Sequence, residues 1–265
     1  MLTSLALGAL IGLILAFTGA GGGILAIPLL VLGLHLPLQE AGPVGLAAVG
    51  IASAAGAMVG LRDQVVRYRA AALIGTVGML SAPVGVALAQ HLPNRPLMAA
   101  FAVLMAWVAW RSLRTPIHET CPAVDLALPC RVNQAEGRLI WTSVCARALA
   151  RTGATSGLLS GLLGVGGGFV IVPALTRYTD LDIRSVQATS LAVIALVSIS
   201  GMVAAAWHGS MNWPVALPFA GGATVALLVG QRLAARVQPA SLKQAFAWLS
   251  MLVAGLMLLR SIGLM

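Results

Sequence analysis

Charged residues are scarce in this chain of 265 residues. Asp, Glu, Lys and Arg make up 9% of it, whereas hydrophobic residues make up 59%, and an average soluble domain has about 25% charged residues. The mean hydropathy of +0.96 excludes an ordinary soluble domain and predicts an all-α polytopic membrane protein. The net charge is +9, but the basic residues lie between apolar runs and form no stripe with interleaved aromatics. This pattern argues against a nucleic-acid partner and favours loop charges beside a lipid bilayer.

Acidic residues and histidines are missing from the interior of every apolar run. They lie at segment ends or in the central polar stretch: Glu40, Asp63, Glu119, Asp125, Glu136, Asp180, Asp182, His35, His91, His118 and His208. Proton- or sodium-coupled carriers usually place a coupling carboxylate inside the membrane. We therefore expect a uniporter or a weakly coupled carrier, with no enzyme activity, no metal site and no cofactor.

Cysteine is also rare. The three cysteines, Cys121, Cys130 and Cys145, all lie in the central polar stretch. Because an odd number in a linker does not indicate a disulfide framework, we expect reduced thiols, and no histidine spacing completes a metal site. No Lys or Arg occurs before Arg62, which argues against a cleaved signal peptide with its basic start.

Glycine, in contrast, is concentrated in two short motifs. The first glycine motif is Gly19-Ala20-Gly21-Gly22-Gly23 and the second is Gly164-Val165-Gly166-Gly167-Gly168, each followed five residues later by a proline, Pro28 or Pro173. Each glycine costs a helix about 1 kcal/mol relative to Ala, and backbone at membrane depth leaves the helix only where it is buried in protein or lines a cavity. We predict that both motifs break a helix and that their free N–H groups bind a small anion.

Close helix packing by small residues is the alternative explanation. It accounts well for Gly8 and Gly12, but less well for three consecutive glycines, which point in three directions around a helix.

The two motifs belong to an internal repeat. A shift of 145 residues aligns Leu46-Ala47 with Leu191-Ala192 and Ser53 with Ser198, and a register shared over about a hundred residues indicates a duplication, as in many secondary transporters. We call this alignment the repeat register. Each half has four apolar segments, at 2–34, 41–61, 70–91 and 96–113, and at 152–178, 185–207, 211–231 and 242–262. We therefore divide the chain into a first membrane repeat (1–113), a linker (114–150) and a second membrane repeat (151–265).

The opening segment of each half predicts a re-entrant helix pair. In the first half, the pieces 4–18 and 23–34 are each too short to span a bilayer, which needs about 20 residues, and together they exceed one straight crossing. If each half crossed four times, ten of the sixteen basic residues would share a side. With re-entrant segments the halves are inverted and fourteen share a side: Arg62, Arg67, Arg69, Arg111, Arg114, Arg131, Arg138, Arg147, Arg151, Arg177, Arg184, Arg232, Arg236 and Lys243.

The positive-inside rule favours the second arrangement. It predicts inverted repeats, with a cytoplasmic linker and both termini outside. Within the linker, residues 138–151 could form an interfacial amphipathic helix, and a plain tether is the alternative.

A second candidate for anion binding is Gln187-Ala188-Thr189-Ser190, which opens the sixth apolar segment. Hydroxyl and N–H groups at a helix start can bind an oxyanion, although capping of the helix alone would explain the same residues. The aligned stretch Gly42-Pro43-Val44-Gly45 lacks hydroxyls, so any site would be asymmetric. Thr18, Ser53 and Ser198 could line a path, but serines in membrane helices commonly bond to a neighbouring backbone.

Taken together, these residues resemble the sulfite exporter TauE/SafE family of bacterial membrane permeases. The resemblance rests on the two glycine motifs with their prolines, on Ala188-Thr189-Ser190-Leu191 and on the repeat of four segments. The first half departs from the family pattern at Pro43-Val44-Gly45, where a Thr-Ser pair is often found.

The resemblance implies export of a small sulfur-containing oxyanion, either sulfite or an organosulfonate such as sulfoacetate. We expect the anion at the N-termini of the broken helices, contacted by Gly19, Gly21, Gly22, Gly23, Gly164, Gly166, Gly167, Gly168, Gln187, Thr189 and Ser190. Uptake of a small organic or sulfur anion and a non-transport redox or assembly role for the cysteines are the alternatives. The exact substrate, the coupling ion and the choice between monomer and homodimer stay open.

Overall fold

The computed structural model describes residues 2–18, 21–114, 130, 132–133, 138–139, 141–207, 211–234 and 239–261. The first half contains α1 (Leu2–Thr18), the 3-10 turn η1 (Gly21–Leu25), α2 (Ala26–Gly33), α3 (Leu38–Arg62), α4 (Tyr68–His91) and α5 (Asn94–Arg114). The second contains α6 (Ser143–Leu163), α7 (Gly168–Tyr178), α8 (Ile183–Trp207), α9 (Trp213–Ala234) and α10 (Pro239–Ser261). Between them, β1 (Val132–Asn133) pairs antiparallel with β2 (Arg138–Leu139). The prediction of an all-helical membrane architecture is confirmed at this level.

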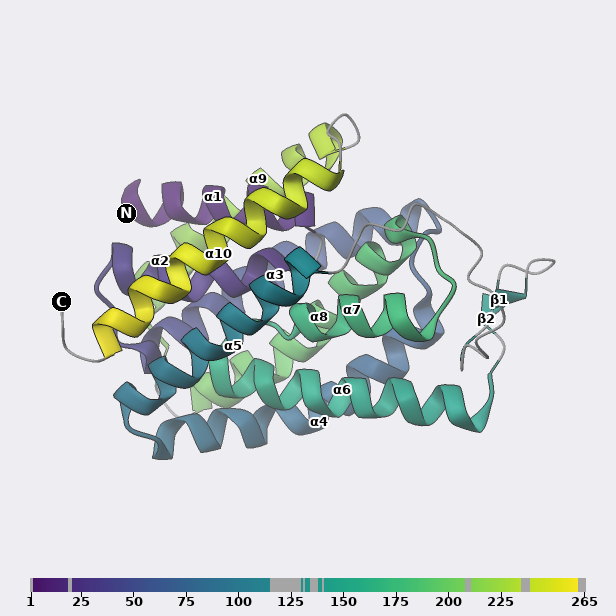
Figure 1. The fold of residues 1–265 in the computed structure, drawn as a ribbon, viewed down its shortest axis with the longest axis horizontal. Coiled ribbons are helices and arrows are strands. Elements are labelled where there is room, and N and C mark those ends of the chain that lie inside the picture. The colour runs from purple at the N-terminus through teal and green to yellow at the C-terminus, as the bar shows by residue number, and fades with distance from the viewer. Residues whose placement is uncertain are drawn as a thin grey trace.

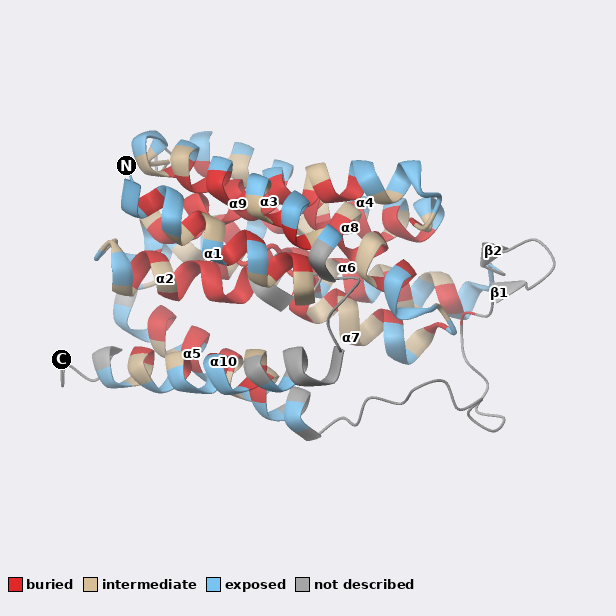
Figure 2. Cartoon of the chain, turned by 90° about the horizontal axis from the view of Figure 1, so that it is seen from above, coloured by how far each residue is buried: buried red, intermediate tan, exposed pale blue. Residues whose placement is uncertain are grey.

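Four helices of the described chain are long and apolar enough to cross a bilayer: Leu38–Arg62, Tyr68–His91, Ile183–Trp207 and Trp213–Arg232. All the long helices run along the same general direction of the molecule (Figure 1). Large apolar side chains such as Leu80 and Leu217 are exposed on the outside, where a lipid phase would cover them. The buried residues concentrate between the helices, along α3 and α8 above all (Figure 2).

The ends of the bundle are occupied by different elements. α1 begins and α10 ends at one end of the molecule, which we call the terminal end (Figure 1). The β1–β2 hairpin lies beyond the opposite end, which we call the linker end. α2 returns beside α1 toward the terminal end, whereas α7 lies toward the linker end, where α6 begins (Figures 1 and 2). Each half thus opens with a helix pair that enters and leaves the bundle at one end.

The helix pairings of the two halves are exchanged. α1 packs against α9 and α6 packs against α4, while α3 packs against α8 at the centre and α5 against α10 at the side. A Cβ on Gly8 would overlap the carbonyl oxygen of Phe219, and a Cβ on Gly153 would overlap that of Ile74. The repeat register pairs Gly8 with Gly153 and Ile74 with Phe219, so these two contacts are equivalent. Close packing is therefore the role of Gly8, as the sequence suggested.

Two expectations for the linker need correction. Cys130 and Cys145 form a disulfide with a Cα–Cα distance of 5.0 Å, so the expectation of reduced thiols is wrong for this pair; Cys121 lies outside the described residues. The Cys130 N–H also donates to the Tyr178 carbonyl oxygen at 3.2 Å, so residue 130 is held between the first turn of α6 and the end of α7. Cys130 is far in sequence from both helices, so the sequence pattern did not predict this arrangement.

The other correction concerns 143–151, which are the first turns of α6 and no separate interfacial helix. The Thr142 hydroxyl caps this helix by accepting the N–H of Cys145 at 3.1 Å. The helix therefore begins at Ser143 and not at residue 152, where the sequence predicted the apolar segment to begin.

Candidate functional site

The second glycine motif separates α6 from α7. Gly164 ends α6 with φ 71° and donates its N–H to the Ser160 carbonyl oxygen at 2.7 Å. Gly166 and Gly167 follow with φ 74° and 67°, and α7 begins at Gly168. These left-handed conformations favour glycine because a side chain there is strained. At Gly167 a Cβ would also lie only 2.6 Å from the Ser156 carbonyl oxygen.

The break leaves a run of backbone donors without acceptors. Among the described residues, the N–H groups of 165–169 have no hydrogen-bond acceptor, and the first used N–H is that of Val170, which donates to the Gly167 carbonyl oxygen at 3.0 Å. All five residues are buried. Consecutive free N–H groups at the start of a helix form an anion-binding nest, and the α7 dipole adds about half a positive charge there.

Buried hydroxyl groups lie close to this run. The side chains of Ser53, Ser160 and Ser198 are 0%, 0% and 1% exposed, and their hydroxyls have no hydrogen-bond partner in the described part of the chain. The Ser198 Oγ lies 3.7 Å from the position that a Cβ on Gly166 would take. Buried polar groups are nearly always satisfied, so a polar ligand bound here could use hydroxyl groups that have no partner among the described residues.

The first glycine motif touches the second. Its described part, Gly21–Leu25, is a 3-10 turn that leads into α2. A Cβ on Gly23 would lie 2.9 Å from the Val165 carbonyl oxygen and 3.2 Å from a methyl carbon of Val49. Gly19 lies outside the described residues. The structure therefore brings Gly23 to the second motif, but the two motifs differ in backbone conformation.

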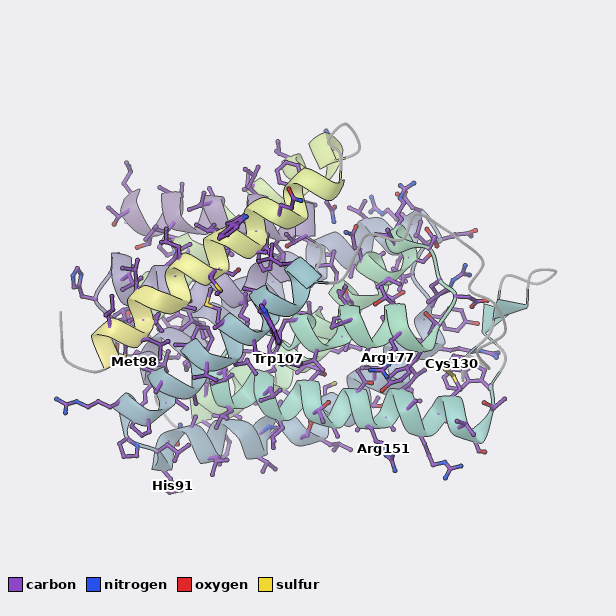
Figure 3. The ribbon with its side chains drawn as sticks, viewed as in Figure 1. His91, Met98, Trp107, Cys130, Arg151 and Arg177 are labelled. Carbon is purple, nitrogen blue, oxygen red and sulfur yellow. A yellow bond between two sulfur atoms is a disulfide. The ribbon has the colours of Figure 1, made fainter. Side chains whose placement is uncertain are left out.

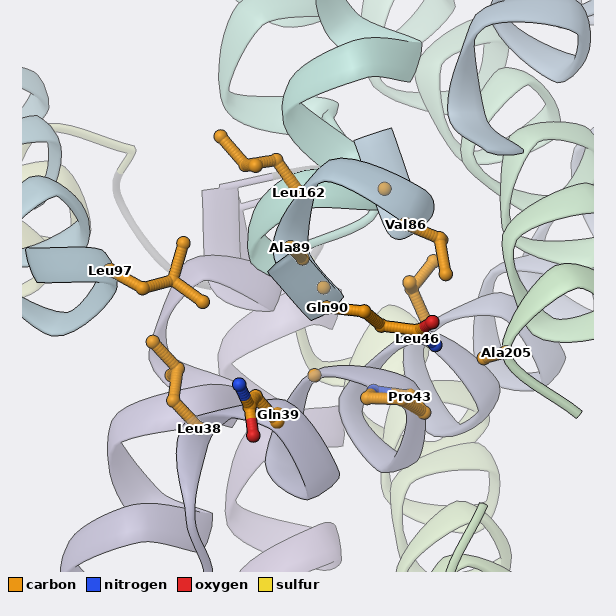
Figure 4. A pocket seen from close by; sticks show the side chains of 13 residues that line it. Leu38, Gln39, Pro43, Leu46, Val86, Ala89, Gln90, Leu97, Leu162 and Ala205 are labelled. Carbon is orange, nitrogen blue, oxygen red and sulfur yellow. The ribbon is translucent and has the colours of Figure 1, made fainter. Parts of the chain in front are cut away.

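A small cavity reaches the second motif from the terminal end (Figure 4). It measures about 30 Å³ and is lined by parts of α3, α4, α5, α6 and α8 and by Gly164. Gln39 and Gln90 are exposed, whereas Gly42 and Gly164 are buried, so the cavity runs from the surface to the helix break. At least 10–15 Å³ is needed per water molecule, which leaves room for about two.

Gln187, Thr189 and Ser190 have other contacts. α8 already begins at Ile183, so these residues lie in its second turn. The Thr189 hydroxyl accepts the N–H of Arg67 at 3.0 Å, and the Ser190 hydroxyl donates to the Gln187 carbonyl oxygen at 2.8 Å. The expectation that this stretch opens the helix is wrong, because the helix continues back to Ile183.

The other path-lining candidates differ in their surroundings. Thr18 donates its hydroxyl to the Ile14 carbonyl oxygen at 2.8 Å and is thus satisfied by its own helix. Ser53 and Ser198 are buried and unsatisfied, as described above. Sequence reasoning missed Ser160 and the glutamines of the cavity, although Ser160 stands one turn before the second motif and Gln90 ends an apolar run.

No ionisable side chain belongs to the helix break. The sequence has no ionisable residue in 41–61, 152–176 or 185–207, and Asp182 and Arg184 lie just before the last of these ranges. His91 lies at the terminal end of the bundle, and Arg177 lies near Cys130 at the linker end (Figure 3). In the described residues there is no group of three or more His, Cys, Asp or Glu that could hold a metal ion. The donors that surround the helix break in the described residues are therefore neutral.

Comparison with known proteins identifies the family. The family model described as "Sulfite exporter TauE/SafE" matches residues 4–257. The chain belongs to this family. Among its relatives is a "Probable membrane transporter protein" of Xylella fastidiosa, 28% identical over 239 residues, covering 89% of this chain and 86% of the relative. "Probable membrane transporter protein YdhB" of Bacillus subtilis is 26% identical over 250 residues, covering 94% and 96%. No solved structure matches the chain.

Family membership and the apolar helices together make this chain a membrane protein of the TauE/SafE family. The match covers both glycine motifs and both sets of helices, so the site described above lies wholly within the family region.

Proposed function

We propose that this TauE/SafE family member is a transporter that exports a small sulfur-containing oxyanion, sulfite or an organosulfonate such as sulfoacetate, across the bacterial inner membrane. The observation that carries the proposal is the run of five buried N–H groups at 165–169 without acceptors, beside the unsatisfied hydroxyl of Ser198. The names of the relatives support transport, and the family description supports the sulfur anion.

The two halves are inverted repeats in this proposal. The support comes from the exchanged packing, since α1 lies on α9 as α6 lies on α4. It also comes from contacts such as Gly12–Ala223 and Gly157–Gly78, whose members again correspond in the repeat register. Inverted repeats provide alternating access because the two halves can exchange their conformations, which opens the site first to one side of the membrane and then to the other. The anion site lies where the halves meet, at Gly23 and Val165.

Two gates follow from the same register. The cavity at the terminal end is lined by Gly42 and Pro43, and the equivalent positions in the second half are Gln187 and Ala188, at the linker end. There α3 and α8 are in contact: a Cβ on Gly60 would lie 3.1 Å from the Ala188 Cβ. The ion pair between Arg184 and Asp63 at 3.2 Å is exposed and contributes only about 0–1 kcal/mol. Weak contacts thus close the gate at the linker end. If this gate opened while the cavity at the terminal end closed, the anion site would become accessible from the other side of the membrane.

The orientation follows from charge. The sequence predicts that fourteen of the sixteen basic residues, those from Arg62 to Lys243 except Arg95, share one side with the linker. The positive-inside rule makes this side cytoplasmic and puts both termini in the periplasm. The disulfide between Cys130 and Cys145 lies on the same side. Because cytoplasmic disulfides are rare, this pair counts against a cytoplasmic linker, and its redox state in intact cells tests the proposed orientation.

Ligand-dependent stabilisation of the purified protein tests the proposal. The panel is sulfite, sulfate, thiosulfate, sulfoacetate, taurine and acetate, and a ligand at 100 times its dissociation constant adds roughly 2.7 kcal/mol of stability. We expect a shift with at least one sulfur oxyanion and none with acetate. Absence of any shift across the panel would refute the sulfur-anion assignment.

Transport by glycine variants tests the site. Replacing both Gly22 and Gly167 by Leu should abolish anion flux in proteoliposomes, because a side chain at Gly167 does not fit its φ of 67° or the Ser156 carbonyl oxygen, 2.6 Å from the Cβ position. Gly221→Leu is the matched control, since a Cβ on Gly221 meets nothing within 4 Å among the described residues. Flux retained by the double variant would exclude the motifs as the binding site.

A further inference from the structure

We propose that the site at the second glycine motif selects singly charged oxyanions. It would take hydrogensulfite and simple monosulfonates in preference to the sulfite dianion, sulfate and sulfoacetate. This inference rests on the proposed function and narrows its substrate class by charge.

The first support is the absence of compensating charge in the sequence of the surrounding helices. The elements that contact the motif come from 21–34, 41–61, 152–176 and 185–207, which contain no Lys, Arg, His, Asp or Glu. Among the described residues, a bound anion would find backbone N–H groups and the hydroxyl of Ser198. Proteins that bury dianions usually supply cations or several charge-assisted hydrogen bonds.

The second support is the size of the field. The start of α7 provides about half a positive charge, and a helix end at the first motif would at most double this. The total of about one positive charge matches a monoanion. Since the Born cost of burial rises with the square of the charge, a dianion costs roughly four times as much to bury, and no further donor charge offsets the difference.

The ionisable groups on the packed helices stand near helix ends or in the opening turns of α6. Glu40, His91 and Arg95 lie at the terminal end, and Arg62, Tyr68, Arg69, Arg111, Arg114, Arg147, Arg151, Arg177, Tyr178 and Arg184 lie toward the linker end. Arg151 is the closest in sequence to Gly164 within α6, at thirteen residues or about 20 Å of helix.

The shape of the surroundings fits an anion with one polar face. The cavity next to Gly164 is lined by apolar side chains, including Leu46, Val86 and Leu162 (Figure 4). An SO₃ group could accept from the N–H groups of the motif while a hydrogen or a methyl group faces this apolar wall. A second charged group in the same place would be desolvated without a partner.

Methanesulfonate and sulfate provide the direct comparison, because they share the tetrahedral head and differ by one charge. We would measure the dissociation constant of each for the purified, full-length protein by titration calorimetry at constant ionic strength. We expect methanesulfonate to bind at least about tenfold more tightly than sulfate, a difference of about 1.4 kcal/mol.

A pH series with sulfite supplies the second arm. Above the second pKa of sulfurous acid the hydrogensulfite fraction falls about tenfold per pH unit, so the apparent affinity for total sulfite should fall equally. The affinity for methanesulfonate should stay flat over the same range, which controls for effects of pH on the protein itself.

The outcomes separate the two proposals. Equal affinity for sulfate and methanesulfonate, or a flat pH profile for sulfite, overturns charge selection and leaves the transport proposal standing. Failure of every sulfur oxyanion to bind overturns the proposed function and this inference with it. Ser198→Ala should weaken methanesulfonate binding, and unchanged binding in that variant would place the monoanion elsewhere.

Discussion

Removal of the Ser198 hydroxyl should make the protein more stable and a weaker binder of its anion. The hydroxyl is buried, with the side chain 1% exposed, and it has no partner in the described structure. An unsatisfied buried polar group costs about 1–3 kcal/mol. Alanine removes this cost and leaves a void of only one oxygen atom, so Ser198→Ala should gain about 1 kcal/mol, or roughly 2–4 °C in Tm for a chain of this size.

Binding should change in the opposite direction. A hydrogen bond to a charged group contributes about 1.5–3 kcal/mol, which corresponds to roughly 10- to 150-fold in dissociation constant. The assays are thermal unfolding of the detergent-purified protein without anion, and calorimetric titration with methanesulfonate. Opposite signs in the two assays distinguish a ligand-binding hydroxyl from a structural one, whose removal lowers stability.

Ser250→Ala is the matched control. Ser250 is also 0% exposed with an unsatisfied hydroxyl in the described structure, but it belongs to α10, which packs mainly on α5. Its replacement should give a similar gain in stability with no change in binding. Loss of stability in Ser198→Ala, or equal effects of the two variants on affinity, would refute the reasoning.

Three further predictions concern the gates, the linker and the packing. Oxidation of a Gly60→Cys, Ala188→Cys double variant should stop transport and reduction should restore it, since a Cβ on Gly60 would lie 3.1 Å from the Ala188 Cβ, near disulfide range. In intact cells, Cys130 and Cys145 should react with maleimide after denaturation without reductant if the linker lies in the cytoplasm as proposed, where the disulfide seen in the structure would be reduced. Gly12→Val should abolish folded protein on size-exclusion chromatography, because a Cβ there would overlap the Ala223 backbone.

Each of these has a control or a contrary outcome. The single cysteine variants should transport equally with and without oxidant. Transport by the oxidised double variant would show that the contact between Gly60 and Ala188 is not a gate. Protection of the native cysteines in cells would place the linker in the periplasm and reverse the proposed orientation. Gly255→Val should fold normally, since a Cβ on Gly255 meets no described atom within 4 Å.

Transport by a Cys130→Ser, Cys145→Ser double variant addresses the redox alternative. The proposed anion site at 164–169 contains neither cysteine, so the variant's anion flux should stay within about twofold of the native protein's, a difference of about 0.4 kcal/mol. Loss of transport in this variant, with folding intact, would favour a redox role for the linker.

Composition and glycine spacing were sufficient to predict the membrane class, the apolar segments and the two helix interruptions. Hydropathy acts locally, and a run such as 185–207 has no stable alternative to a buried or lipid-facing helix. The repeat register was visible because the contacts between halves need small residues at equivalent positions, such as Gly8 and Gly153. These features depend on residues that are neighbours in sequence or on a repeated pattern.

The use of each polar group was decided only by tertiary packing. Thr189 accepts a hydrogen bond from Arg67, 122 residues away, whereas Ser198 has no partner in the described structure; both are hydroxyls in the same apolar helix. The disulfide of Cys130 likewise depends on where the linker meets α6. A hydrogen bond requires two groups within about 3 Å, and that distance is determined by which helices pack together, which the local pattern around a single hydroxyl does not encode.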